Sequence, residues 1–207
     1  MFILSLIYSV LFWMSLEILT FVMFFVSYLP LSMETMYNLI RWGLRIIFSL
    51  FFIKVRTHGF DRLRDKDRVL LIANHPGLID PLYLIAYFPQ RLRFVASTVL
   101  FTVPFFGRLV TRVGAIPHSA DKKKSMVYAS QLLNVLKKGE LVMLFPLEIR
   151  DSLEHFQLSE EAIAPLAQAL GAEVVSITLL GTELVLPLDN AILKPGRIEV
   201  VVGGPNA

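Results

Sequence analysis

Residues 69–88 read VLLIANHPGLIDPLYLIAYF, and this stretch decides the fold class. Its first five residues are a short apolar run of the kind that forms a buried strand. The Pro76-Gly77 pair favours a turn, and residues 81–88 have the composition of a short helix that Pro89 stops. A strand, a turn and a helix in twenty residues are typical of an α/β domain.

The rest of the chain beyond Gly59 continues this alternation. Helical patterns end at Gly139 and at Gly171, and glycine is a common residue after a helix. Ser159 is the expected cap of the helix before Gly171. We therefore predict an α/β fold with a mostly buried sheet flanked by helices. The further predicted strands are 92–96, 141–145, 174–180 and 198–202, and the further helical segments are 99–113 (interrupted by Pro104), 125–138 and 159–170.

The amino terminus has a different character, because Glu17 is the only charged side chain among residues 1–30. This apolar run is long enough to cross a bilayer. Residues 34–53 form a second predicted helix, in which Arg41 and Arg45 lie one turn apart, a pattern typical of an interfacial helix. The alternative is the buried hairpin of a soluble core. We predict a membrane-associated two-helix hairpin at residues 1–53, followed by an α/β domain at 54–207.

The composition and the distribution of charge limit the protein class and the binding partners that fit this chain. The 207 residues are 55% hydrophobic and 18% charged, with a mean hydropathy of +0.63 and no cysteine, which excludes disulfide scaffolds and cysteine nucleophiles. Residues 54–150 carry 16 basic and 7 acidic side chains, whereas the remainder carries 4 and 10. A basic block beside an apolar terminus favours a phospholipid surface over nucleic acid. Because the basic residues follow the first helix, the positive-inside rule predicts a membrane location with the body on the cytoplasmic face.

His75 and Asp80 are the candidate catalytic residues. In a continuous helix their side chains would diverge by about 140°, so they meet only if Pro76-Gly77 turns the chain. An imidazole held by a carboxylate acts as a general base, and the chain has no G-x-S-x-G nucleophile motif, so the base would act directly on a substrate hydroxyl. The alternative is that Asp80 caps the helix and His75 is a loop residue. No histidine spacing suits a metal, and we predict none.

Four motifs in order resemble the glycerolipid acyltransferases, the 1-acyl-glycerol-3-phosphate acyltransferase family. The N-H-x4-D motif is present, and it is followed by Gly-x-Ile-Pro, by a block resembling F-P-E-G-T-R, and by a late strand ending in Gly-Thr. The resemblance implies that His75 and Asp80 are catalytic and that Asn74, Gly114, Glu148 and Arg150 bind substrate. The four matching segments are 74–80, 114–117, 145–150 and 174–182.

Lys122 and Lys123 are further candidates for binding the acceptor. They stand where the 125–138 helix is expected to begin, and cations there oppose the helix dipole unless an anionic head group lies nearby. The alternative is a solvated run of charges.

The resemblance implies transfer of a fatty acyl group to a lysophospholipid hydroxyl, foremost that of 1-acyl-glycerol-3-phosphate. The donor would be acyl-CoA or an acyl carrier protein thioester, with no further cofactor. Three departures concern the groups expected to hold phosphate: Ser97 replaces a lysine, His118-Ser119 replaces Asp-Arg, and Leu147-Glu148 replaces Glu-Gly. They predict a relaxed choice of acceptor. The alternative function is a catalytically degraded relative that binds lipid or supports a partner enzyme.

Overall fold

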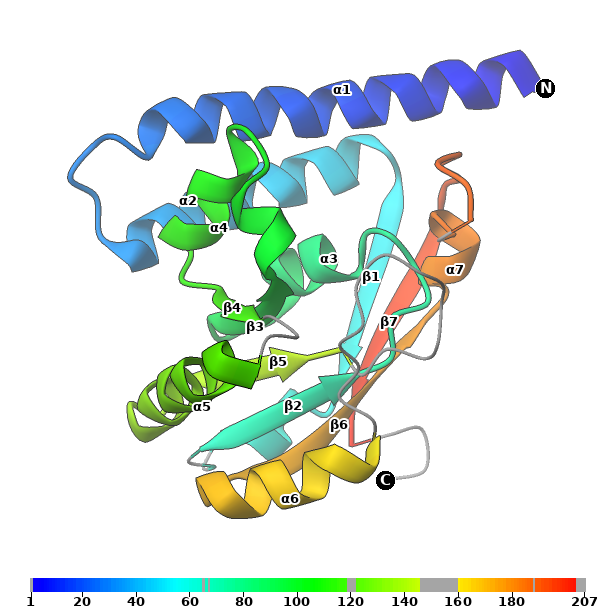
Figure 1. Cartoon of the computed structure of the whole chain (residues 1–207). Helices are drawn as coiled ribbons and strands as arrows, with labels where there is room; N and C mark the ends of the chain where they lie inside the picture. Colours follow the sequence, from blue (N-terminus) through cyan, green and yellow to red (C-terminus); the bar gives the residue numbers. More distant parts are fainter. Residues whose placement is uncertain are drawn as a thin grey trace.

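The computed structural model describes residues 2–64, 66, 68–118, 122–145, 160–187 and 189–203. These residues form one seven-stranded sheet in the order β1-β7-β6-β2-β5-β3-β4 (Figure 1). Only the β6–β7 pair is antiparallel among the described strands, and the other neighbours run parallel. The strands are β1 Ile53–His58, β2 Val69–Ala73, β3 Leu92–Ser97, β4 Ile116–His118, β5 Leu141–Leu144, β6 Glu173–Leu180 and β7 Gly196–Val202.

Helices cover both faces of the sheet, which confirms the predicted α/β class. Alternate side chains of a strand point to opposite faces, so on β2 Val69 and Leu71 join the core beneath α2 and α3, whereas Leu70 packs with α5 and α6. The helices are α1 Phe2–Val26, α2 Met33–Leu50, α3 Asp80–Tyr87, α4 Phe106–Arg112, α5 Lys122–Lys137, α6 Glu160–Leu170 and α7 Thr182–Val185, with 3₁₀ turns η1 Phe60–Leu63 and η2 Thr98–Phe101.

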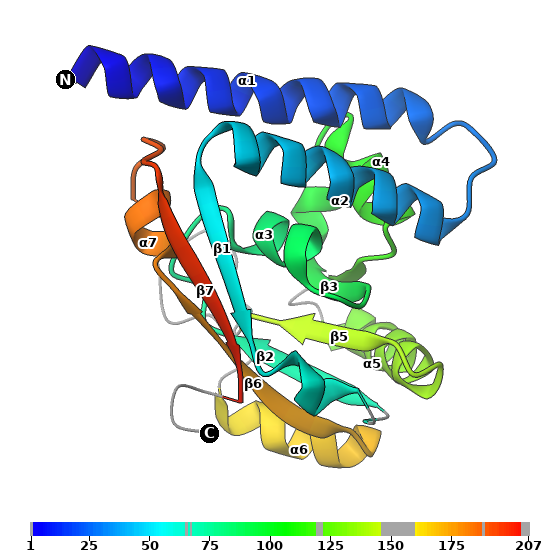
Figure 2. The ribbon, with the colours of Figure 1, turned by 180° about the vertical axis from the view of Figure 1, so that it is seen from behind.

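The amino-terminal hairpin is a layer of this fold. Helix α2 lies between α1 and the sheet in both views, and α4 also reaches α1 (Figures 1 and 2). Phe12 of α1 and Phe48 of α2 are fully buried in the same hydrophobic core as β2, β6 and β7. The Trp13 indole donates to the carbonyl of Ala191 at 3.0 Å, which ties α1 to the segment before β7. One hydrophobic core therefore crosses the predicted boundary at residue 53.

Two strands lie outside the sequence prediction. The second helix ends at Leu50 and not at 53, and Ile53 begins β1 at the sheet edge. Residues 53–58 alternate apolar and polar, which is the signature of a strand with one covered face. The three residues of β4 are too few to show any period. The predicted 99–113 helix divides into η2 and α4 on either side of Pro104.

Helices α3, α5 and α6 follow the prediction closely, with shifted ends, whereas the short α7 lies outside the sequence prediction. Helix α5 begins at Lys122, three residues before the predicted start. Helix α6 covers most of the predicted 159–170 segment, and its expected cap, Ser159, lies outside the described residues.

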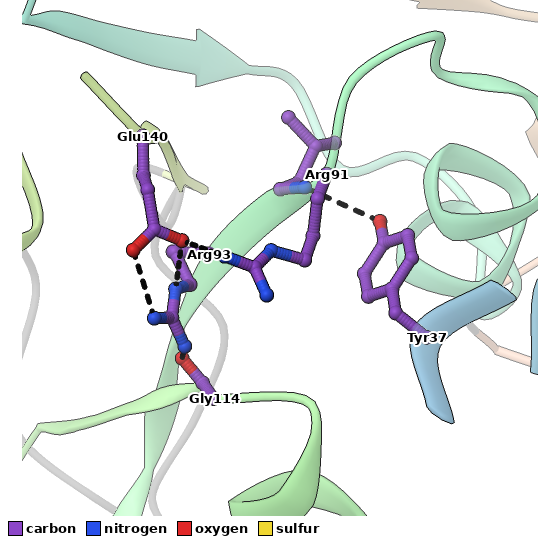
Figure 3. Close-up of polar contacts among 6 residues, drawn as sticks. Tyr37, Arg91, Arg93, Gly114 and Glu140 are labelled. Carbon is purple, nitrogen blue, oxygen red and sulfur yellow. Dashed lines mark hydrogen bonds and ion pairs between the residues drawn. The ribbon is translucent and has the colours of Figure 1, made fainter. Parts of the chain in front are cut away.

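A buried ion pair joins β3 to the turn before β5 (Figure 3). Arg93 is 9% exposed, and its guanidinium donates to Glu140 through Nε at 2.7 Å and Nη2 at 3.0 Å. Arg91 also pairs with Glu140. Between the two arginines, the Leu92 amide donates to the Tyr37 hydroxyl of α2 at 3.3 Å. The cluster thus connects the sheet to the amino-terminal hairpin.

This pair predicts a pH-dependent contribution to stability. Burial raises the pKa of Glu140, but the Arg93 and Arg91 guanidiniums outweigh burial and hold that pKa below its usual range. Because the folded pKa is the lower one, the stabilisation is complete above the unfolded value of about 4.3 and is lost as pH falls through the folded value. We expect Glu140→Gln to lower the free energy of unfolding at pH 7 by about 3 kcal/mol, since it leaves Arg93 buried and unpaired.

The measurement is denaturant unfolding in detergent at pH 7 and below pH of about 4, where the difference from wild type should shrink. The control is Glu173→Gln, which removes the exposed pair with Lys66 and should cost under about 1 kcal/mol. Equal losses in the two variants would contradict the prediction.

Candidate active site

The site lies where β2 ends, the edge at which open α/β sheets place ligands. The chain leaves β2 after Ala73, turns, and enters α3 at Asp80 (Figure 1). Two contacts with the segment that follows α7 hold this turn: the Leu78 amide donates to the Leu186 carbonyl at 3.1 Å, and Gly77 forms a β-bridge with Pro187. The turn is therefore built against a distant part of the chain.

The structure brings His75 and Asp80 together, as the predicted turn requires. His75 Nδ1 lies 2.6 Å from Asp80 Oδ2. The Asp80 side chain has no solvent exposure, whereas 27% of the His75 side chain is exposed. The imidazole stacks on Phe145 with 4.6 Å between ring centroids. With Nδ1 against the carboxylate, Nε2 is the nitrogen left for a substrate hydroxyl.

Asp80 does not cap α3 in the way the alternative interpretation required. It is the first helical residue, and the residue before it, Ile79, occupies the cap position without a side-chain hydrogen bond. The carboxylate faces back into the turn, where Oδ2 also accepts the Gly77 amide at 2.9 Å. Its Oδ1 is buried and has no hydrogen-bond partner in the described part of the chain. The side chain thus serves the turn and the histidine.

Asn74 links the turn to β6. Its side-chain amide donates to the Leu179 carbonyl at 2.8 Å, and its Oδ1 accepts the Leu179 amide at 2.7 Å. Both ends of the side chain therefore hold the backbone of β6, which gives Asn74 a structural role. Its predicted contact with substrate stays a prediction.

Gly77 is a functional position that the sequence reasoning treated only as part of a turn. A Cβ atom at Gly77 would lie 2.9 Å from backbone atoms of Thr182, closer than real Cβ atoms approach. Only glycine lets the turn come this near to α7. The Pro-Gly pair was the available signal, but the crowding that requires glycine comes from a residue 105 positions away.

Gly114 lies at the other end of the sheet. Its φ is +76°, and its carbonyl accepts from Arg93 Nη1 at 2.9 Å (Figure 3). Arg93 is in register with Val142, and Val142 with Leu70, near the start of β2. His75 lies five residues after Leu70 along the chain, which at about 3.3 Å per residue is a distance of about 16 Å. The structure therefore gives Gly114 a backbone role and does not bring it to the imidazole.

The remaining candidates are placed only in part. Lys122 and Lys123 are the first two residues of α5, and their side chains are outside the description. Glu148 and Arg150 lie outside the described residues. The His118 ring packs edge-on against Tyr128, and burial lowers the pKa of His118. Within the described ranges no three His, Asp or Glu side chains group as metal ligands, and the absence of a metal stays a prediction.

Comparison with known proteins identifies the family. A family model described as Acyltransferase matches residues 54–179, which include the whole turn from β2 to α3. The chain belongs to the acyltransferase family. This confirms the resemblance that the N-H-x4-D motif and the segments after it indicated.

The acyltransferase is similar to several curated 1-acyl-sn-glycerol-3-phosphate acyltransferases. It is 26% identical over 157 residues to the chloroplastic LPAT1 of Arabidopsis thaliana, covering 74% of this chain and 44% of that protein. It is 28% identical over 154 residues to an enzyme of Chlamydomonas reinhardtii, covering 73% and 46%. A Helicobacter pylori enzyme is 35% identical over 63 residues, covering 30% and 27%. The chain therefore spans less than half the length of these relatives.

The fold has a counterpart among solved structures. The crystal structure of the 1-acyl-sn-glycerophosphate acyltransferase PlsC from Thermotoga maritima superposes with a TM-score of 0.75 at 19% identity. The match covers 97% of this chain and 84% of that one. It thus includes the amino-terminal hairpin as well as the α/β body.

The geometry predicts that the His75–Asp80 pair carries the chemistry. We expect His75→Ala to lower kcat/KM by about 10²–10⁴-fold, the usual contribution of a general base. Asp80→Asn should also be strongly impaired, because the carboxylate orients the imidazole and stabilises its protonated form. His58→Ala is the control, since His58 is an exposed residue at the end of β1 and its loss should leave turnover unchanged. Near-wild-type activity of His75→Ala would refute the assignment.

Proposed function

We propose that this acyltransferase moves a fatty acyl group from a thioester to the hydroxyl of a lysophospholipid, foremost 1-acyl-glycerol-3-phosphate, which would yield phosphatidate. The observation that carries the proposal is the 2.6 Å contact between the partly exposed His75 and the fully buried Asp80 at the family's motif position. The curated relatives named as 1-acyl-sn-glycerol-3-phosphate acyltransferases support the choice of acceptor.

The reaction follows from the two side chains. His75 Nε2 takes the proton of the acceptor hydroxyl, and the hydroxyl oxygen attacks the carbonyl carbon of the thioester. The resulting imidazolium is stabilised by Asp80 through Nδ1. When the carbon–sulfur bond breaks, the departing thiolate takes the proton from the imidazolium, and the products are an ester and a free thiol. Acyl-CoA and an acyl carrier protein both supply such a thioester.

Acceptor recognition is the second part of the proposal. A lysophosphatidate phosphate is best held by several preorganised cationic donors. The basic block at residues 54–150 attracts it, with Arg150, Lys122 and Lys123 as the proposed phosphate contacts and Glu148 as a further proposed substrate-binding residue. The lysine, arginine and glutamate that the family pattern expects at 97, 119 and 147 are absent from the sequence. We propose that selection for this compact anion is weaker than the chemistry at His75.

The hairpin supports a membrane-bound protein. Residues 3–26 of α1 are long enough and apolar enough to cross a membrane. Its inner side packs on the body, as Phe12 and Trp13 show. The outer side presents apolar residues with half or more of their surface exposed, namely Ile3, Leu4, Ile7, Leu11, Met14, Ile18, Phe21 and Phe25. A helix covered by the body along one side fits insertion into one leaflet, lying along the surface, better than a separate span.

Two further features support this shallow placement. The Glu17 side chain is exposed and lines a surface pocket together with Ile18, Phe21 and Phe105. A charge is costly in the hydrocarbon core but tolerated near the interface. The Phe105 ring, on the turn before α4, packs edge-on against Phe24 at 5.0 Å and extends the apolar surface of α1.

We place the body on the cytoplasmic face, where soluble thioester donors are available.

One observation favours the alternative of a catalytically degraded relative. The altered second and third motifs remove groups expected to hold the phosphate. A protein of that kind would bind lysolipid without turnover, and its His75→Ala variant would behave as wild type in every assay. The intact His75–Asp80 contact weighs against it.

The acceptor prediction is tested by kcat/KM for lysophosphatidate, lysophosphatidylethanolamine and lysophosphatidylglycerol, with both donor types. We expect lysophosphatidate to be preferred by less than about a hundredfold, or about 2.7 kcal/mol. Arg150→Ala should lower the lysophosphatidate value most, and Arg64→Ala is the matched control, because Arg64 is an exposed arginine directly after η1. A larger preference would refute the relaxed choice, and unchanged values in Arg150→Ala would remove Arg150 as a phosphate ligand.

The membrane prediction is tested by flotation with liposomes. We expect the protein to stay bound in high salt and to be released by detergent, because apolar insertion is insensitive to screening. Ile18→Asp with Phe25→Asp should weaken binding, since both side chains lie on the outer side of α1. Val174→Asp is the control, an exposed apolar residue at the start of β6. Release of the wild type by salt alone would contradict insertion.

A further inference from the structure

We propose that Arg41 and Arg45 of α2 are positioning residues for the His75–Asp80 pair, so that the amino-terminal hairpin is a working part of the active site. The inference rests on the proposed function. It starts from where the two arginines point. Their spacing predicted a basic face toward lipid head groups, but both guanidiniums are directed into the protein and donate to backbone carbonyls.

The four hydrogen bonds from these arginines to backbone carbonyls end on the last turn of α3 and on the residues just after it. Arg41 Nη2 donates to the carbonyls of Phe88 at 3.0 Å and Gln90 at 3.1 Å. Arg41 Nε donates to the carbonyl of Ile85 at 3.1 Å. Arg45 Nε donates to the carbonyl of Ala86 at 2.6 Å.

These contacts satisfy a need that α3 has by itself. The last carbonyls of a helix have no partner within it, and a helix of eight residues is too short to persist without packing. Positive charge at this end also interacts favourably with the negative end of the helix dipole. At the other end the same dipole favours the Asp80 carboxylate, so α3 is held by arginines at its last turn and carries the catalytic carboxylate on its first residue.

The packing between α2 and α3 makes this link rigid. Phe48 is fully buried and lies 6.3 Å from the Tyr83 ring and 6.2 Å from the Tyr87 ring, centroid to centroid. The Arg45 guanidinium lies 5.6 Å from the centre of the Tyr87 ring. Residues 41, 45 and 48 recur at helical spacing on one face of α2, and that face meets α3.

The link from α2 to α3 affects the position of Asp80. Helix α3 is a rod of about 12 Å, so a shift at its carboxyl end is carried to Asp80 at the other. A displacement of about 1 Å at a catalytic group can cost about a hundredfold in rate. Losing both arginines should therefore lower kcat by about 10- to 100-fold and leave KM within about threefold.

The experiment compares Arg41→Ala/Arg45→Ala with Arg112→Ala in full-length protein. Arg112 of α4 also donates to backbone carbonyls, but to those of Leu29 and Leu31 after α1. We expect the kcat loss only in the α2 variant. Arg41→Lys/Arg45→Lys should recover part of it, because a lysine ammonium keeps the charge and one donor contact. Equal kcat losses in Arg112→Ala would overturn the proposal.

Two further measurements separate positioning from general destabilisation. If the arginines act through Asp80, their loss should have little further effect on kcat in an Asp80→Asn background, because effects through one shared group are not additive. The same fold-loss in both backgrounds would overturn the proposal. Should the double variant fail to fold, Arg45→Ala alone provides the same comparison.

The last measurement does not depend on the substrate. Hydrogen exchange at the α3 amides should accelerate in the α2 variants and not in Arg112→Ala. Unchanged exchange at α3 would overturn the proposal even if the enzyme is active. Conversely, a wild type that acylates none of the lysophospholipids would refute the proposed function, while faster α3 exchange in the arginine variants would still support the link from α2 to α3.

Discussion

The burial of the Asp80 carboxylate is the constraint on which the rest of the site depends. A carboxylate without solvent exposure costs several kcal/mol unless charges or donors surround it. Here the Gly77 amide, the His75 ring and the amino-terminal end of α3 supply them. The turn, the imidazole and the helix are thereby held in one arrangement, and a loosely held version of any of them would leave the charge without its partners.

The same requirement explains why the turn is tied to distant strands. Asn74 holds the backbone of β6, and Gly77 lies against Thr182. The segment that follows β6 is therefore as much a part of the site as the motif itself. The family's late Gly-Thr element, Gly181-Thr182 here, has a physical explanation in this contact, because the turn between β2 and α3 packs against it.

The amino-terminal hairpin has two surfaces with different tasks. Its inner surface completes the hydrophobic core, through residues such as Phe12, Leu44 and Phe48. The outer surface of α1 remains apolar and exposed. Under the proposed function, a membrane contact through the outer surface and an α3 helix held by the inner one would place His75 and Asp80 at a defined distance from the lipid surface, where a lysophospholipid acceptor would reside.

Local sequence patterns determined the strand-turn-helix unit at 69–88, the alternation beyond it and the meeting of His75 with Asp80, because period and Pro-Gly turn chemistry act over a few residues. They did not determine β1, in which the charges at 54 and 56 hid an edge strand, or the direction of Arg41 and Arg45. Asn74 finds its partner 105 residues away, and Arg41 finds the end of α3 more than 40 residues away. Only the tertiary structure decides such contacts, because a polar side chain binds whichever backbone groups the packed fold leaves without partners.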